Sequence, residues 1–282
     1  MQTTVNNESL IVVDGHVHIH SCFDLEILLD NALSNFQTLH GHNAAFCLAL
    51  TESKSQNYFH RLFQLSQGKE SGLNLNFWQI IATDEPCSLY AQKSEARSTN
   101  TEGVYLIAGR QVVTLEGLEV LALLTEETFL DGYPIEQTIH DVLESGGIPV
   151  IPWGFGKWMG NRGRRLLKLL QSSIPGLFLA DNSGRPIFWP EPVFFQQAKQ
   201  QGIAILSGTD PFPFKSEVNR PGRAGFSIYG ALDPLKPATS LRKLLLYPNS
   251  SPELYGDLEA PLQCLRNQIA IQYLKHFRNN YI

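Results

Sequence analysis

The residues with the clearest chemical potential are three alternating histidines, His16, His18 and His20, which follow the apolar run 10–13. Side chains alternate between the two faces of a strand, so the three imidazoles are expected on one face at the strand's end. Neutral imidazole is the commonest metal ligand, and two histidines at this spacing can share one ion. Three of the eight histidines lie within these five positions, which favours a binding site over a polar strand end. We interpret His16 and His18 as ligands and His20 as solvated.

A carboxylate far along the chain completes this candidate site. Asp210 directly follows the predicted strand 203–206 and its short Ser-Gly-Thr extension. Two imidazoles and one carboxylate form a ligand set for Zn, Mn or Fe, and they leave a position open for water. We therefore expect one divalent metal ion held by His16, His18 and Asp210, with Asp210 as the catalytic carboxylate. Glu52, which follows another predicted strand, is a further candidate ligand.

A glycine-rich basic stretch, residues 154–165, follows a predicted strand and opens a predicted helix. Glycines expose backbone N–H groups and a helix N-terminus favours anions, so the stretch is typical of phosphate or carboxylate binding. Ammonium and guanidinium groups suit the same anions. A solvated basic helix start is the alternative interpretation. The candidate anion- or substrate-binding residues are Lys157, Arg162, Arg164, Arg223, Gln111 and Trp153.

Short apolar strands that alternate with amphipathic helices must position these groups. In the second half of the chain the predicted strands are 148–151, 177–180 and 203–206, and the predicted helices are 163–172 and 192–201. This alternation predicts a parallel sheet with helices outside it. Parallel barrels carry their chemistry on the loops after the carboxyl ends of the strands. The polar groups that follow each predicted strand are therefore expected to converge on one rim.

The whole chain, residues 1–282, is interpreted as a single α/β domain. Its length suits one (β/α) barrel of the TIM type as well as it suits two small domains, and it contains no linker or repeat that would divide it. The strand-like run 104–114 is predicted as one strand. Two C-terminal helices, 237–247 and 258–277, are expected to close the barrel.

Composition limits the expected partners and compartment. The chain is 43% hydrophobic and 17% charged, and its net charge is −5, so bulk charge indicates neither nucleic acid nor an anionic membrane. The four cysteines are widely spaced, which favours free thiols in a reducing compartment. No apolar run reaches membrane-spanning length. We expect a cytoplasmic protein with a small-molecule anionic substrate and no nucleic-acid or membrane partner.

The order of these pieces, from about residue 12 to residue 212, resembles the polymerase and histidinol phosphatase (PHP) family. His16 and His18 match its opening His-x-His motif, and residues 208–212 resemble its closing Gly-Ser-Asp-Ala-His. Weaker matches are Thr51-Glu52-Ser53, Gly109-Arg110-Gln111 and the segment 146–153. The resemblance implies a distorted seven-stranded (β/α) barrel and a metal-dependent phosphoesterase. Our leading prediction is hydrolysis of a small phosphorylated substrate.

The sequence departs from the family at several expected ligand positions, which hold Ser53, Gln111, Pro152 or Trp153, and Phe212. A neutral amide does not bridge two cations as a carboxylate does, so Gln111 in place of the bridging glutamate favours at most one ion. The same departures favour an alternative function, a catalytically degenerate barrel that binds an anionic ligand without turnover.

An amidohydrolase-like C–N hydrolase is a third interpretation. The amidohydrolase superfamily also opens with His-x-His and closes with an aspartate, and Gly-Thr-Asp-Pro at 208–211 resembles its last motif. That superfamily needs two later histidines on separate strands. His140 and His276 fall in helical patterns instead, so neither fits this role.

Overall fold

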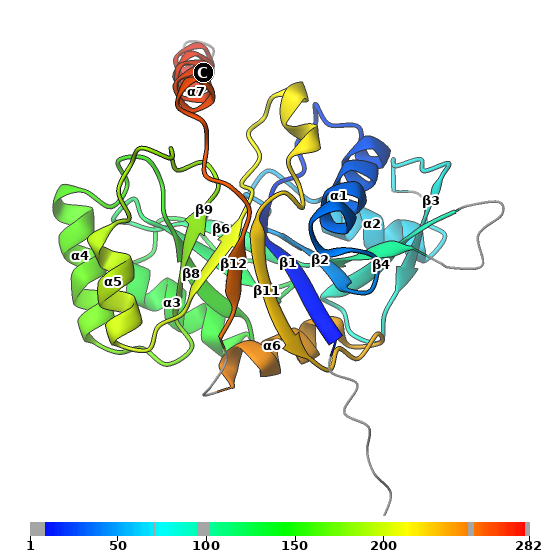
Figure 1. Cartoon of the computed structure of the whole chain (residues 1–282), viewed down its shortest axis with the longest axis horizontal. Coiled ribbons are helices and arrows are strands. Elements are labelled where there is room, and N and C mark those ends of the chain that lie inside the picture. The colour runs from blue at the N-terminus through cyan, green and yellow to red at the C-terminus, as the bar shows by residue number, and fades with distance from the viewer. Residues whose placement is uncertain (1–8, 70, 95–101, 248–250, 280–282) are drawn as a thin grey trace, which may run out of the picture.

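The structure is a computed structural model of the chain that describes residues 9–69, 71–94, 102–247 and 251–279, with side chains up to residue 273. These residues form two mixed β-sheets with helices packed around them (Figure 1). Within the same ranges, every helix is too short or too polar to span a lipid bilayer.

The first sheet has seven strands among the described residues, and its centre is parallel. β1 pairs in parallel with β2, and β2 with β5, whereas β11 and the β3–β4 pair run antiparallel to their neighbours. In spatial order the strands are β12 (Glu253–Tyr255), β11 (Gly225–Gly230), β1 (Ser9–Val17), β2 (Ala45–Leu50), β5 (Gly103–Ile107), β4 (Ser88–Lys93) and β3 (Trp78–Ala82).

The second sheet has five strands in the described part of the chain. β8, β9 and β10 are parallel, and β6, β7 and β8 are antiparallel. In spatial order the strands are β10 (Ile205–Gly208), β9 (Phe178–Asn182), β8 (Ile148–Pro152), β7 (Glu119–Leu123) and β6 (Gly109–Val113).

The described strands correct the predicted single TIM-like barrel, because they form two sheets and no closed barrel. The predicted strand 104–114 breaks at Ala108 into β5 and β6, which belong to different sheets. Only five residues then separate β6 from β7. A parallel pair needs a crossover of a dozen or more residues, so these two strands must run antiparallel.

The helices cover the outer faces of the sheets and one end of the core between them. α1 and α2 pack on the first sheet, and α3, α4 and α5 pack on the second (Figure 1). Buried apolar side chains from both sheets meet in a central core, and α6 packs Ala238, Leu241 and Leu245 against it. The helices are α1 (Leu25–His40), α2 (Tyr58–Ser66), α3 (Ile135–Glu144), α4 (Gly160–Gln171), α5 (Val193–Gln200), the 3-10 helix η1 (Lys215–Asn219), α6 (Pro237–Leu246) and α7 (Pro261–Asn279).

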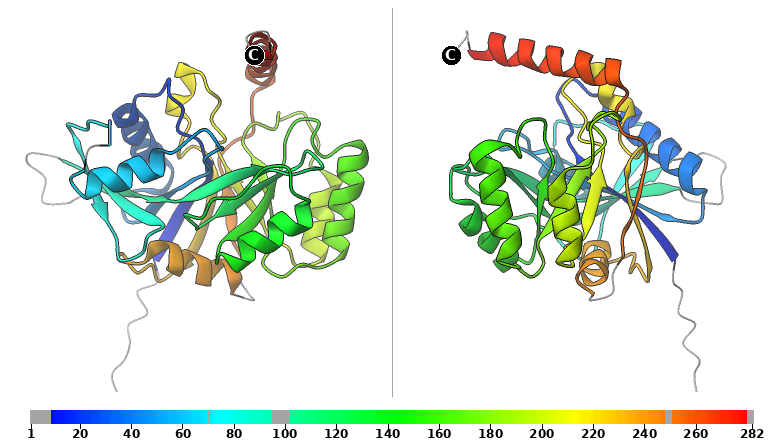
Figure 2. Two further views of the ribbon diagram at one scale, coloured as in Figure 1. Left: turned by 180° about the vertical axis from the view of Figure 1, so that it is seen from behind. Right: turned by 60° about the vertical axis from the view of Figure 1, so that its left-hand side comes forward.

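The last helix does not close the core as predicted. α7 stands away from both sheets at the end of the molecule opposite α6 (Figure 2). Leu262, Leu265 and Ile269 on this helix are 82%, 58% and 62% exposed. The amphipathic pattern correctly predicted a helix, but the pattern does not define what the apolar face contacts.

The two sheets meet where the end of β1 lies against the end of β10. A Cβ atom on Gly208 would lie 2.2 Å from the backbone nitrogen of His16, and one on Gly15 would lie 2.7 Å from the carbonyl oxygen of Ser207. Only glycine permits so close a backbone approach. Just beyond β10, the Asp210 N–H donates to the His16 carbonyl at 2.7 Å.

A second seam joins the end of β2 to β6. The Glu52 N–H donates to the Gly109 carbonyl at 3.2 Å, and the Gln111 N–H donates to the Glu52 carbonyl at 3.0 Å. Together the two seams bring β1, β6 and β10 to one end of the molecule. In Figure 1 this is the upper end, to which the carboxyl ends of β1 and β9 point and from which α6 is most distant.

We expect Gly208→Ala to lower the free energy of unfolding by about 3 kcal/mol, because the added methyl group would overlap the buried His16 backbone. Urea denaturation followed by far-UV circular dichroism measures the change. Gly184→Ala is the matched control, since its Cβ would meet nothing closer than 3.6 Å. Equal stability of the two variants would contradict the close approach of β1 and β10.

Candidate metal centre

His16 and His18 lie at the carboxyl end of β1, and the two residues are only 1% and 7% exposed. The register between β1 and β2 is irregular between Asp14 and Val17. Irregularities of this kind commonly re-aim side chains beside functional sites. The two Nε2 atoms lie 3.1 Å apart. Both imidazoles are therefore directed at one point.

Two further polar atoms reach the same point. Gln111 Oε1 lies 3.1 Å from His16 Nε2 and 3.2 Å from His18 Nε2. Asp210 Oδ1 lies 3.5 and 3.6 Å from the same two nitrogens. We call these four side chains the central cluster. Ligand atoms about 2.0 Å from one zinc ion in a tetrahedral site lie roughly 3.3 Å apart, so these separations suit atoms that share an ion.

The chemistry of the central cluster fits a cation. Burial, together with His16, lowers the pKa of His18 from its ordinary 6.5 to about 3, so His18 is a neutral ring. Among the described residues, neither His16 Nδ1 nor His18 Nδ1 has a hydrogen-bond partner. Gln111 Oε1 and an ionised Asp210 can only accept, so each imidazole that faces them must either donate a proton or share a cation with them. His16, His18 and Asp210, whose ligand atoms lie within 4.8 Å of one another, could hold one divalent ion.

Asp210 is turned into the cluster by its backbone and by Asn182. Its φ of 45° lies in the left-handed region, which aspartate tolerates better than most residues. Asn182 Nδ2 donates to Asp210 Oδ2 at 2.9 Å, so the other oxygen faces the histidines. Burial opposes ionisation of this carboxyl, but His16, His18, Lys157 and Arg220 together hold its pKa below its ordinary value.

Asp14, a fully buried carboxylate on β1, fixes the backbone around the cluster. It accepts hydrogen bonds from Thr209 N at 2.8 Å, Thr209 Oγ1 at 2.6 Å, Gly222 N at 2.9 Å and His16 N at 3.3 Å. Burial raises the pKa of Asp14 to about 6, although these donors oppose the shift. Sequence reasoning gave Asp14 no role. Its position two residues before His16, on the same strand face, was the available signal.

Glu52, predicted as a metal ligand, lies outside the central cluster. Its Oε1 accepts the N–H groups of Tyr58 and Phe59, the latter at 3.1 Å, at the start of α2. Its Oε2 accepts Arg110 Nη1 at 3.1 Å. A carboxylate is stabilising at a helix N-terminus. The structure therefore gives Glu52 the role of joining α2 to β6.

The predicted anion-binding residues are dispersed. Lys157 forms an ion pair with Glu119, yet it is close enough to influence Asp210. Arg162 Nη2 donates to the Gly156 carbonyl at 3.0 Å, which holds the glycine-rich loop. Arg164 is exposed and contacts Asn161 on its own helix. Of these three cations, the structure brings only Lys157 toward the central cluster.

Trp153 and Gln111 also occupy different environments. Trp153 is 6% exposed and packs in the core beneath α4 and α5. Its carbonyl accepts the same Asn182 Nδ2 that orients Asp210, at 3.1 Å. Gln111, by contrast, belongs to the central cluster itself.

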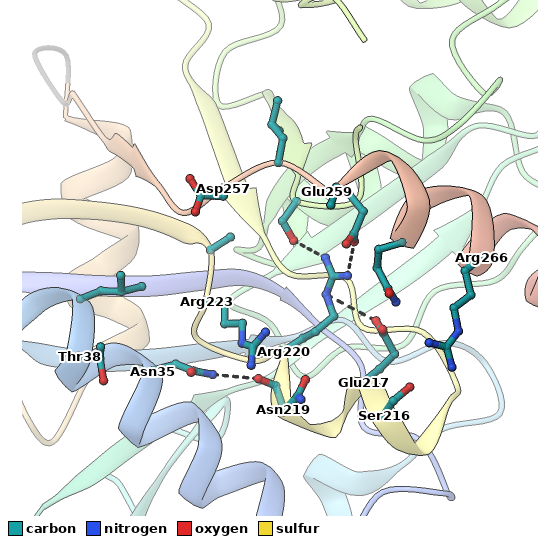
Figure 3. Close-up of a pocket in the computed structure, with 16 residues that line it drawn as sticks. Asn35, Thr38, Ser216, Glu217, Asn219, Arg220, Arg223, Asp257, Glu259 and Arg266 are labelled. Carbon is teal, nitrogen blue, oxygen red and sulfur yellow. Dashed lines mark hydrogen bonds and ion pairs between the residues drawn. The ribbon is translucent and has the colours of Figure 1, made fainter. Parts of the chain in front are cut away.

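Arg223 lines a separate pocket of about 620 Å³ between α1, η1 and the start of α7 (Figure 3). The guanidinium of Arg220 faces the same pocket and forms ion pairs with Glu217 and Glu259. Arg220 Nη2 also donates to Ser183 Oγ at 2.7 Å. Arg220 is therefore a neutralised, structural cation, and Arg223 is exposed on the pocket wall.

Two other predictions about histidines can be compared with the structure. His20, expected to be solvated, donates from Nε2 to the Pro211 carbonyl at 2.9 Å, and its ring centroid lies 5.6 Å from that of His18. It therefore borders the central cluster. His140 is exposed on α3 and pairs with Glu144, and the side chain of His276 is outside the described residues. The described part of the chain thus supplies no later histidine to the cluster.

Comparison with known proteins gives structural similarity only. No family model and no curated protein matches the sequence. The crystal structure of PsfC from Pseudomonas syringae PB-5123 aligns over 94% of this chain and 99% of its own, with a TM-score of 0.54 and 15% identity. The lesion-specific endonuclease EndoQ from Pyrococcus furiosus aligns over 87% of this chain with a TM-score of 0.51 and 12% identity. The alignment covers 57% of the EndoQ chain.

A two-domain protein from Bacteroides vulgatus that contains a predicted PHP-like metal-dependent phosphoesterase aligns over 89% of this chain, with a TM-score of 0.46 and 10% identity. This value is too low to carry an argument, so the similarity of fold rests on PsfC and EndoQ. At these identities the alignments show a shared fold and no shared activity.

The comparison with EndoQ corrects one prediction. Net charge and composition led us to expect a small anionic substrate and no nucleic acid. That expectation is wrong, because an endonuclease shares the fold. Net charge describes the whole surface, whereas contact with a strand depends on the local surface around a site.

We expect Glu52→Gln to lower the free energy of unfolding by about 2 kcal/mol, because it removes the charge that pairs with the partly buried Arg110. Metal affinity, measured by isothermal titration calorimetry on the folded variant, should not change. The double variant Glu52→Gln/Arg110→Met should recover part of the lost stability. A loss of metal without a loss of stability would instead assign Glu52 to the metal site.

Proposed function

We propose that this protein is a metal-dependent phosphoesterase. The observation that carries the proposal is the convergence of His16 Nε2, His18 Nε2 and Asp210 Oδ1 at separations of 3.1 to 3.6 Å. A divalent ion in such a site supplies Lewis acidity toward water and toward a phosphoryl oxygen. Zn, Mn and Fe all accept this ligand set.

The other residues of the site support the same reaction. Asn182 and Asp14 act as positioning residues, since the first orients the Asp210 carboxylate and the second fixes the Thr209 and His16 backbone. Lys157, although paired with Glu119, is near enough to Asp210 to favour its ionised form, so it offsets part of the negative charge that an anionic substrate would meet. Gln111 contributes a neutral oxygen, which favours one ion over two.

We propose a phosphodiester of a nucleic-acid strand as the substrate. The support is the fold shared with EndoQ, which is an endonuclease. We also propose that the two sheets form one domain, a distorted barrel of the PHP kind. Hydrogen bonds at the two seams, from Asp210 N to His16 O and from Gln111 N to Glu52 O, support that arrangement.

The protein purified with Mn or Zn should hold at most one equivalent of metal per chain, as measured by elemental analysis. His16→Ala and His18→Ala should each remove that metal, because two of the three ligands cannot hold it alone. His140→Ala is the matched control, since this histidine is exposed on α3. Two or three equivalents per chain would contradict the proposed ligand set, as would metal retained by both cluster variants.

With Mn or Zn added, the protein should hydrolyse a generic aryl phosphodiester and cleave a single-stranded oligonucleotide. Asp210→Asn should reduce the rate by about a hundredfold or more while the fold persists, because the loss of a carboxylate ligand weakens the ion. Asp257→Asn, a change at an exposed carboxylate, should have no effect.

If the wild type is inert with every divalent metal but still binds the oligonucleotide, the phosphoesterase proposal fails. The catalytically degenerate alternative, which Gln111 favours, would then hold. Unchanged activity in Asp210→Asn would place the chemistry elsewhere.

A further inference from the structure

Three aromatic rings gather on the loops that follow β8 and β9. The ring centroid of Trp189 lies 5.3 Å from that of Phe155 and 6.5 Å from that of Trp153, and both pairs are edge-to-face. We call Trp153, Phe155 and Trp189 the aromatic platform. Its exposure increases outward: Trp153 is 6% exposed, Trp189 is partly exposed and Phe155 is 51% exposed.

The outer part of the platform is not explained by core packing. Trp153 belongs to the core beneath α4 and α5, and Trp189 packs on its edge. The side chain of Phe155 is not among the buried residues of that core. Phe188, the residue before Trp189, is 65% exposed. Adjacent exposed aromatic rings beside a polar site are typical of a binding surface.

The loop that carries Trp189 is held in place by a buried ion pair. Arg185 Nε and Nη2 bond the Asp181 carboxylate at 2.9 and 2.6 Å, and the side chains are 8% and 12% exposed. Arg185 Nη1 then donates to the Trp189 carbonyl at 2.7 Å, and the Trp189 N–H donates to the Pro186 carbonyl at 2.8 Å. These bonds fix the Trp189 part of the platform before any ligand binds, which lowers the entropic cost of binding.

The backbone of Trp153, the innermost residue of the platform, is tied to the central cluster. Asn182 Nδ2 bonds both the backbone carbonyl of Trp153 and Asp210 Oδ2, so one nitrogen atom links the chain at Trp153 to the proposed metal ligand. Phe155 lies two residues beyond Trp153, and Lys157, two residues further, is close enough to influence Asp210. The loop that carries Phe155 therefore leaves the core at Trp153, one hydrogen-bonded side chain away from Asp210.

We propose that the aromatic platform stacks an unpaired nucleobase of the strand whose phosphodiester occupies the central cluster. This inference rests on the proposed function and narrows it to strands with unpaired bases. Every base has a π-face, and stacking on exposed aromatic side chains is how proteins commonly hold single strands without reading sequence. A paired base is already stacked within its duplex, so it would not be free to reach the platform.

Tryptophan fluorescence provides a direct readout. The chain has four tryptophans, and Trp78 and Trp158 are 3% and 6% exposed and lie outside the platform. The experiment titrates metal-free protein in EDTA with a fluorescein-labelled single-stranded DNA. It compares this DNA with the same strand carrying abasic sites and with its duplex. Anisotropy of the label measures affinity, and an unlabelled copy of each strand is used to measure quenching.

The base-bearing single strand should quench the tryptophan fluorescence and bind about tenfold more tightly than the abasic strand or the duplex. Phe155→Ala should lower the affinity for the base-bearing strand about tenfold and leave the affinity for the abasic strand unchanged. Trp189→Phe should remove most of the quenching and keep most of the affinity. Tyr229→Ala is the matched control, because this ring is 68% exposed on β11 and pairs with Leu10, at the opposite end of β1 from the cluster.

Equal affinities for the base-bearing and abasic strands would overturn the proposal, as would an unchanged affinity in Phe155→Ala or no binding of any strand. Thermal unfolding checks the variants, and Phe155→Ala decides the matter if Trp189→Phe does not fold. Because the titration contains no metal, its outcome is independent of hydrolysis. Base-dependent quenching without any hydrolysis would refute the phosphoesterase alone, and hydrolysis without base-dependent binding would refute the platform alone.

Discussion

The buried carboxylate of Asp14 is the interaction on which the site depends. A carboxylate without water is stable only when donors satisfy its oxygens, and here they come from β1, from the residue after β10 and from the turn at Gly222. Thr209 precedes Asp210, and Gly208 abuts the His16 backbone. The same carboxylate therefore fixes the backbone at His16 and the backbone beside Asp210, although it contributes no atom to the central cluster.

Glu52 has a comparable role at the second seam. Its carboxylate caps α2 and pairs with Arg110, while its backbone bonds both Gly109 and Gln111. Each seam between the sheets thus contains one buried acid whose donors come from both sides. The acids hold the backbone, so the side chains of His16, His18 and Gln111 are directed at one another.

The sequence was most informative where a local rule decides the outcome. The strand-end rule placed His16, His18 and Asp210 on one rim, and their ligand atoms lie within 4.8 Å of one another. The sequence was uninformative where contacts between residues far apart in the chain determine the structure. The run 104–114 has strand-like residues on both sides of Gly109-Arg110-Gln111, and that short polar stretch does not by itself show that the chain changes sheet at Ala108. The orientation of Glu52 depends on Arg110 and on the start of α2, which no spacing rule connects.

The separation of Asp14 and Thr209 along the chain, 195 residues, has a consequence for how the protein folds. Contacts of such long range are slow to form, because the intervening chain must first lose the entropy of closing a loop. On a ribosome, His16 and His18 emerge well before Asp210 has been synthesised. His16 and His18 are therefore synthesised long before their partner Asp210 is present. The complete cluster is expected to be among the last parts of the structure to form.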